Sequence, residues 1–410
     1  MRRLVFSGLV CLSLAALTAP ASELLNGFDL FMEQAMRDHG VNGAAVAVVH
    51  EGKLVLMKGY GFRDVAQHLP VTPTTVFPIA SITKSFTVTA LGALVDEGKL
   101  EWDKPVREYL PGFRMYDPVA TDQLSPRDLV THRSGLPRHD IIWYSSSFTR
   151  EQLVDRLRYL EPNKPLRSTF QYNNLMFVTA GYLGGKVAGS TWEELVRKKI
   201  LQPLGMTRTM LTSAEARKGN DYALPYRRNL HTDDVSVIEF PNWGDVGPAG
   251  SINSNIEDMA KYLLMHVNKG TFEGRTLLSK NNAEQMQTPQ MVLRGISPDS
   301  ELGDQSYGMG FFIQSYRGYK IVSHGGNLDG FSLNLAMMPE TRTGVVVLTN
   351  LDGASVRDFV PWNIFNRALG LEPIDWSSRF LERRKKAKEQ ELAAESKGYT
   401  GQKKDTRSKS

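Results

Sequence analysis

Residues 81–97 read SITKSFTVTALGALVDE, and they place a serine and a lysine at the start of a long apolar run. Apolar residues recur through the run at helical spacing, which predicts a helix ending near Gly98. Residues three apart lie on one face of a helix, so the Ser81 hydroxyl and the Lys84 amine should be neighbours. An amine in that place can take the hydroxyl proton and make the serine a nucleophile. The same pattern fits a buried helix that Ser81 caps while Lys84 extends towards solvent, and this segment alone does not decide between the two.

Strand-like segments lie at both ends of the chain. Two precede the helix, at 44–49 and 54–60, and a turn at 50–53 joins them as a hairpin. The later strand-like segments are 309–314, 319–323, 331–338 and 345–350, followed by a helical stretch at 354–369. Between the two groups, helical periodicity recurs at 81–97, 150–160, 174–188, 191–201 and 255–268. We therefore predict an α+β fold: an antiparallel sheet formed by both chain ends and flanked by helices, with a large inserted helical region.

Two further motifs carry chemistry. Tyr172-Asn173-Asn174 lies in a loop before a predicted helix. A tyrosine with a depressed pKa could share a proton with Lys84, and the Asn174 amide could hold a substrate carbonyl. Taken alone, however, this motif fits an aromatic packing residue beside a helix cap better. The second motif, His324-Gly325-Gly326, ends a predicted strand, and its glycines allow backbone to approach a ligand closely.

The order of these motifs resembles that of serine β-lactamases and penicillin-binding proteins, in which SxxK, YxN and a basic residue-x-Gly triad follow one another. More narrowly, the chain resembles the class C β-lactamase-related group, which includes D-Ala-D-Ala carboxypeptidases, D-aminopeptidases and esterases. Residues 127–137, RDLVTHRSGLP, are similar to the LLTHTSGLP signature of that group. The resemblance extends over roughly residues 24–370 and implies a β-lactamase/transpeptidase-like fold.

The resemblance implies roles for the first two motifs. Ser81 would be the nucleophile, Lys84 and Tyr172 would handle its proton as a coupled pair, and Asn174 would hold the substrate amide. Lysine and tyrosine ordinarily titrate near pH 10, so the site must lower one of the two pKa values. The sequence leaves open which of them is the base.

The third motif bears on substrate. The resemblance implies an oxyanion hole formed by the backbone N–H groups of Ser81 and Asn327, with Gly325 and Gly326 in the binding strand. It also places His324 where β-lactamases usually have lysine. A histidine is largely uncharged at pH 7, so it is a poor anchor for a carboxylate, which disfavours efficient β-lactam hydrolysis.

These features predict a serine hydrolase that cleaves an amide or ester bond of a small peptide or ester substrate through an acyl-enzyme on Ser81. The alternatives are a true β-lactamase and a catalytically silent sensor that binds penicillin or peptidoglycan. We expect no cofactor, no metal site and no nucleic-acid partner, and the sequence does not determine the oligomeric state.

The N-terminus indicates export. Arg2 and Arg3 precede an apolar run from 4 to 17 and the small residues of 19–21, a pattern typical of a signal peptide over residues 1–21. That run is too short to span a bilayer comfortably, so we expect a periplasmic or secreted protein without a stable membrane span. The single cysteine, Cys11, lies inside the signal, so disulfides and thiol chemistry are excluded from the mature chain.

The remaining chain divides into a hydrolase domain at 22–376 and a basic helical or disordered tail at 377–410. The net charge of +5 lies mostly outside the domain, because residues 381–410 carry ten Lys/Arg against five Asp/Glu. A nearly neutral body is poor evidence for a nucleic-acid-binding surface.

Overall fold

The computed structural model describes residues 20–144, 146–240, 246–295 and 297–405, and in 396–405 the backbone only. The predicted signal peptide lies outside this part of the chain apart from its last two residues. Of the helices in the described ranges, none has both the length and the apolar character needed to cross a membrane.

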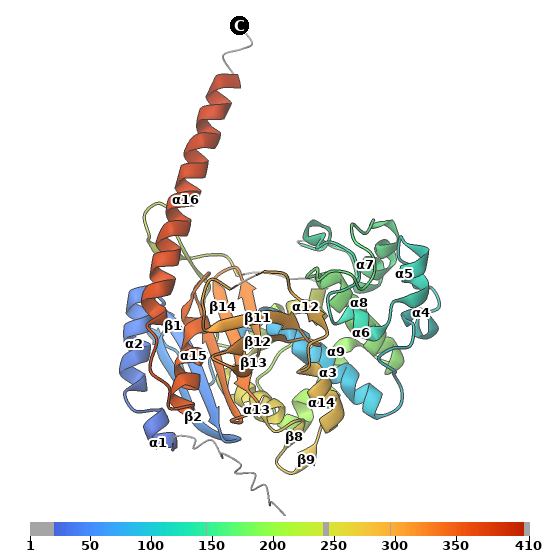
Figure 1. The fold of residues 1–410 in the computed structure, drawn as a ribbon, viewed down its shortest axis with the longest axis horizontal. Coiled ribbons are helices and arrows are strands. Elements are labelled where there is room, and N and C mark those ends of the chain that lie inside the picture. The colour runs from blue at the N-terminus through green and yellow to red at the C-terminus, as the bar shows by residue number, and fades with distance from the viewer. Residues whose placement is uncertain (1–19, 145, 241–245, 296, 406–410) are drawn as a thin grey trace, which may run out of the picture.

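A nine-stranded antiparallel sheet forms the centre of the fold, in the order β10-β11-β12-β13-β14-β15-β1-β2-β3. Its strands are β1 Gly43–His50, β2 Lys53–Asp64, β3 Leu69–Pro70, β10 Met291–Val292, β11 Leu302–Tyr307, β12 Phe312–Tyr316, β13 Tyr319–Leu328, β14 Phe331–Met338 and β15 Thr343–Thr349. β1 pairs with β15 over Ala44–Val49, which confirms that the two chain ends meet in one sheet (Figure 1). The predicted α+β class is therefore correct.

The central strands are buried on both faces because helices cover each of them. Along β1, Ala45, Ala47 and Val49 enter one core while Ala44, Val46 and Val48 enter the other. This alternation follows from the two-residue period of a strand. The helices α2 Phe28–His39 and α15 Val356–Ala368 cover one face, and α13 Ile256–Val267 lies against the other.

The inserted helical region lies to one side of the sheet (Figure 1). Its main helices are α3 Thr83–Asp96, α7 Arg150–Asp155, α8 Asn174–Val187 and α9 Trp192–Val196, with the short helices α4 Val106–Tyr109, α5 Pro118–Gln123, α6 Pro126–Leu129 and α12 Gly247–Gly250. α3 packs against α8 and connects this region to the sheet. The two motif-bearing helices predicted from periodicity are therefore neighbours.

The late strands differ from the prediction in three respects. β12 begins at Phe312 rather than Met309, because Gly310 adopts a left-handed φ of 77° in the preceding turn. β13 continues to Leu328, so the His-Gly-Gly motif lies within the strand. β10 and β11 were not predicted, because LGDQSY in β11 is polar and poor in strand-forming residues.

The C-terminal helix α16 Trp376–Asp405 starts on the body and then projects away from it (Figure 1). Trp376 is buried against the rings of Tyr316 and Trp362. Arg379 and Arg383 pair with Asp299, which lies ahead of β11. The first turns of α16 therefore brace the edge of the sheet.

Candidate active site

Ser81 lies in a short 3-10 turn, η1 Ala80–Ile82, directly ahead of α3. The preceding residue, Ala80, has φ 46°, which is a strained conformation for a residue with a Cβ. Neither η1 nor α3 has a side-chain cap, so Ser81 is not the N-cap of the helix. Its Oγ instead lies 3.1 Å from Lys84 Nζ. Lys84 is fully buried, so the alternative of a capped helix with a solvent-reaching lysine is wrong.

The Lys84 amine lies in an apolar and aromatic environment. Its Nζ donates to the carbonyl oxygen of Ala249 at 2.8 Å and lies over the rings of Tyr172 and Phe177. Burial, and next the charge of Arg138, lower the pKa of Lys84 well below its ordinary value, although Asp140 opposes them. An uncharged amine beside a serine hydroxyl has the properties of a general base.

Tyr172 lies in the loop before α8, and its hydroxyl lies close to Ser81. Burial raises the pKa of Tyr172 above the ordinary value, because it outweighs the lowering effects of Ser81 and of Arg138. A depressed tyrosine pKa, one of the two possibilities that the sequence left open, is therefore not found. Desolvation disfavours the charged form of both groups, so the lowered pKa of the pair belongs to the lysine.

Asn174 is the first residue of α8, after the N-cap residue Asn173. Its Nδ2 donates to Asp140 Oδ1 at 3.2 Å. Its Oδ1 is buried and has no hydrogen-bond partner among the described residues. A buried amide oxygen without a partner is suited to accept an N–H from a substrate.

The strand β13 presents backbone to Ser81. Its pairing with β12 stops at Ser323, so from His324 onward only β14 pairs with it. Leu328 and Phe331 flank the two-residue turn, and the closing pair of such a hairpin is hydrogen-bonded. Asn327 belongs to the next pair, which is not hydrogen-bonded, so its N–H points away from β14. A Cβ added to Gly326 would lie 2.5 Å from the Ile79 oxygen, which shows how closely this free edge approaches η1. The proposed oxyanion groups on Ser81 and Asn327 thus lie on facing elements.

His324 is almost fully buried, and both of its ring nitrogens have partners. Nδ1 lies 2.7 Å from the Gly325 carbonyl and Nε2 lies 3.1 Å from the Tyr307 hydroxyl. A neutral ring satisfies both contacts, with Nδ1–H donating and Nε2 accepting. Burial, and next the charge of Lys84, lower the pKa of His324 to about 3. This histidine is therefore uncharged at neutral pH.

Sequence reasoning missed two supporting residues. Tyr307, on the unpredicted strand β11, holds His324. His132 lies within the 127–137 signature, accepts the Asn173 N–H at 3.0 Å and places its ring 4.3 Å from that of Tyr172. The signature marked His132 as a position of interest, but no signal in the sequence placed it behind Tyr172.

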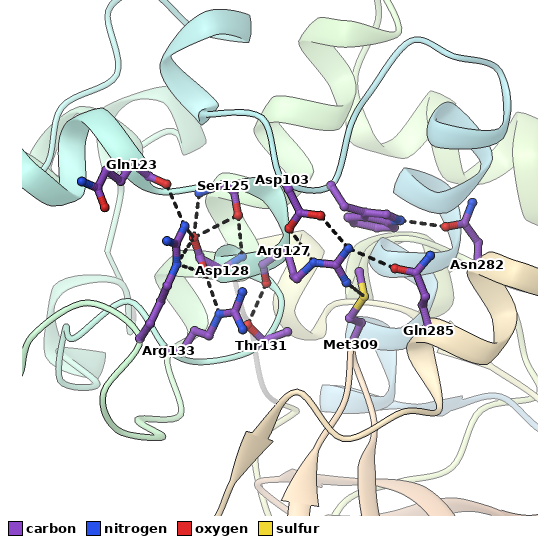
Figure 2. A network of polar contacts seen from close by, with 12 residues as sticks. Asp103, Gln123, Ser125, Arg127, Asp128, Thr131, Arg133, Asn282, Gln285 and Met309 are labelled. Atoms are coloured by element: carbon purple, nitrogen blue, oxygen red, sulfur yellow. Dashed lines mark hydrogen bonds and ion pairs between the residues drawn. The ribbon is translucent and has the colours of Figure 1, made fainter.

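The buried carboxylate of Asp128 anchors this signature segment (Figure 2). It accepts from Arg133 Nε at 2.6 Å and Arg167 Nη2 at 2.8 Å, and it forms a capping box with Ser125. Burial raises the pKa of Asp128, but the ion pairs with Arg167 and Arg133 and the Ser125 N–H outweigh it and hold the pKa below its ordinary value. The network fixes the turn that carries His132.

The candidate residues other than Lys84 and Gly326 line one cleft of about 410 Å³, within the range of small-molecule sites. Residues from the helical region and from the sheet share its walls: Ser81, Arg138, Trp143, Tyr172, Asn174, Gln305, Phe312, Ser323, His324, Gly325, Asn327, Asn334, Arg357 and Asp358. Gly326 does not line the cleft and acts through its contact with η1. No cluster of metal-ligating side chains occurs in the described part of the chain.

Nucleophilic serines commonly rely on a histidine, but here a buried lysine is the neighbour of Ser81. A lysine in place of that histidine, together with a sheet built from both chain ends, defines a serine hydrolase of the penicillin-recognising class. The family model described as Beta-lactamase matches residues 28–368, and the chain belongs to this family.

Relatives in the family have varied names. The chain is 29% identical to unguisins hydrolase ungD' from Aspergillus campestris, over 87% of this chain and 68% of that protein. It is 26% identical to protein flp from Staphylococcus aureus, over 81% of this chain and 64% of that protein. The chain thus spans about two thirds of the length of these curated relatives.

Solved structures share the fold. An octameric penicillin-binding protein homologue from Pyrococcus abyssi is 28% identical, with a TM-score of 0.74 over 85% of this chain and 78% of that one. A D-amino acid amidase from Ochrobactrum anthropi SV3 is 23% identical, with a TM-score of 0.69 over 85% of this chain and 98% of that one. At that identity, the amidase comparison supports the fold alone.

Proposed function

We propose that the protein is an exported serine hydrolase that cleaves an amide or ester bond of a small peptide or ester substrate through an acyl-enzyme on Ser81. One observation carries the proposal: Ser81 Oγ lies 3.1 Å from the amine of a fully buried lysine. Burial lowers the pKa of Lys84, which favours its action as a base without histidine.

In the proposed reaction, Lys84 takes the Ser81 proton while Oγ attacks the substrate carbonyl carbon. The N–H groups of Ser81 and Asn327 stabilise the oxyanion, and Asn174 holds the substrate amide. The tetrahedral intermediate collapses when the leaving group receives a proton from the Lys84/Tyr172 pair. Water then attacks the acyl-enzyme, with the pair again taking the proton, and releases the acid and the free serine.

The neutral state of His324 supports peptide or ester substrates over β-lactams. A β-lactam carries a carboxylate, and a permanent cation in the binding strand would anchor it, whereas His324 has a pKa lowered to about 3. The name of one relative, an unguisins hydrolase, agrees with a hydrolytic reaction. Export is proposed from the pattern of residues 1–21 alone.

A substrate panel tests the proposal: D-aminoacyl p-nitroanilides, p-nitrophenyl esters and a chromogenic cephalosporin, each with wild type and Ser81→Ala. We expect turnover of the anilides or esters by wild type, loss of that turnover in Ser81→Ala, and fluorophosphonate labelling at Ser81. The control is Ser168→Ala, which replaces an exposed serine and should keep full activity. Full turnover by Ser81→Ala would disprove the role of Ser81, and a persistent adduct without turnover by intact mass would favour the sensor.

Export has its own test. Expression of the full chain in a Gram-negative host, followed by fractionation and N-terminal sequencing, should give a mature protein in the periplasm that begins near Ser22. A cytoplasmic product that retains Met1 would contradict this part of the proposal.

A further inference from the structure

A rim segment, residues 138–144, lies along the helical wall of the cleft and contacts the proposed catalytic groups. The Arg138 guanidinium lies 5.1 Å from the centre of the Tyr172 ring. Asp140 accepts from Asn174 Nδ2 at 3.2 Å and from Trp143 Nε1 at 3.0 Å. The position of the rim segment is therefore coupled to the groups that would meet the substrate.

The opposite wall carries a fixed acceptor at Asp329, in the turn between β13 and β14. Arg227 Nη2 donates to Asp329 Oδ1 at 2.6 Å, and Arg227 Nε donates to Asp352 at 3.2 Å. The turn also packs tightly, since a Cβ on the neighbouring Gly330 would lie 2.2 Å from Pro225. Asp329 is thus held on the sheet side by groups that do not belong to the rim.

One side chain joins the two walls. The Tyr144 hydroxyl donates to Asp329 Oδ2 at 2.9 Å, across 185 positions of sequence. Tyr144 directly follows Trp143, and Asp329 follows Asn327 by two residues, and both Trp143 and Asn327 line the cleft. The contact therefore joins the two walls next to residues that line the cleft.

We propose that the Tyr144–Asp329 bridge closes one end of the cleft and selects substrates that are short on that side. The selection of substrate length rests on the proposed function, whereas the closure itself is a property of the geometry. Tyr144 is 54% exposed and the Asp329 side chain is 41% exposed, so water competes for this single hydrogen bond. The bridge is strong enough to restrict the cleft and weak enough to be opened by substitution.

Thiol labelling tests the closure without relying on catalysis. The lone natural cysteine is Cys11, so a Cys11→Ser/Ser81→Cys protein carries one thiol, at the base of the cleft. The alkylation rate of this thiol is measured with small iodoacetamide and with bulky fluorescein-5-maleimide. The proteins compared are this parent protein and its Tyr144→Phe and Tyr144→Ala derivatives. Thiol reactivity is common to both reagents, so the ratio of their rates reports access.

We expect Tyr144→Ala to raise the maleimide rate at least tenfold and Tyr144→Phe to raise it about threefold, with iodoacetamide changed less than twofold. Tyr116→Phe, at another exposed tyrosine, is the matched control and should change neither rate. An unchanged maleimide rate in Tyr144→Ala, or equal changes for both reagents, would overturn the bridge.

An ester series tests selection in the active enzyme. p-Nitrophenyl acetate is compared with p-nitrophenyl esters of N-blocked di- and tetra-alanine, on wild type and Tyr144→Ala. We expect kcat/KM for the tetra-alanine ester to rise at least fivefold and that for the acetate to change less than twofold. If wild type turns over neither these esters nor the anilides of the substrate panel, the proposed function fails while the labelling ratio still decides the closure. Equal changes for short and long esters would overturn the selection.

Discussion

Gly326→Ala should separate the two halves of the proposed oxyanion hole. Gly326 has an ordinary φ, so alanine adds no backbone strain, and the effect is purely steric. The new Cβ would lie 2.5 Å from the Ile79 oxygen and 3.1 Å from Ala80 Cβ. An ordinary contact requires about 3.5 Å, so β13 and the turn that carries Ser81 must move apart by about 1 Å.

A misplacement of about 1 Å costs on the order of a hundredfold in rate, equivalent to about 2.7 kcal/mol of transition-state stabilisation. We therefore expect kcat/KM on a p-nitrophenyl ester to fall about a hundredfold in Gly326→Ala. Gly112→Ala, outside the cleft, is the control, because its Cβ would have no neighbour within 4 Å. Thermal unfolding of both variants checks that they remain folded. The reasoning is refuted if folded Gly326→Ala keeps kcat/KM within threefold of wild type, or if Gly112→Ala loses as much.

Four further outcomes are expected. Lys84→Met should lower kcat/KM about a thousandfold, because it removes the proposed base. In the wild type, kcat/KM should rise from acid pH to a plateau and should not fall near pH 10, because the pKa of Lys84 is lowered and that of Tyr172 is raised. Asp128→Asn should lower the free energy of unfolding in urea by about 3 kcal/mol at neutral pH. Since the folded pKa of Asp128 is depressed, that difference is complete above the unfolded pKa of about 4 and is lost as pH falls through the folded value. Trp376→Ala should cost about 3 kcal/mol in the same assay, whereas exposed Glu391→Ala should cost almost nothing. His324→Lys should improve kcat/KM for a cephalosporin about tenfold relative to a neutral ester, and an unchanged ratio would argue against charge control at this position.

Local pattern was sufficient to predict the centre of the fold. The Ala/Val run of β1 and the alternating late strands identified a sheet made from both chain ends. The order of SxxK, YxN and His-x-Gly named Ser81, Tyr172 and His324, which line one cleft, and the buried Lys84 beside Ser81, but no spacing in the sequence gives the distances between them. The sequence did not predict the contacts between residues that lie far apart in the chain and belong to no motif.

Two omissions have physical causes. β11 has no apolar alternation, since it is held as a strand by pairing with β12, and so its Tyr307 could not be assigned to His324. Nor could the sequence decide which of Lys84 and Tyr172 has the lowered pKa. Composition names the titratable groups, but only burial determines which charged form is disfavoured, and burial is a property of the assembled fold.

Desolvation of four titratable groups links these observations. Lys84, Tyr172, His132 and His324 are desolvated together, and burial is the largest cause of each pKa shift. The charge of Lys84 also lowers the pKa of His324, so the two groups would repel if both were protonated. A neutral histidine in the binding strand therefore spares the lysine an adjacent cation, but it gives up the attraction for a substrate carboxylate. His324→Lys would gain carboxylate binding, but it must also depress the pKa of Lys84 further, because two neighbouring cations in a desolvated site disfavour each other. Substrate charge and base strength are thus coupled through position 324.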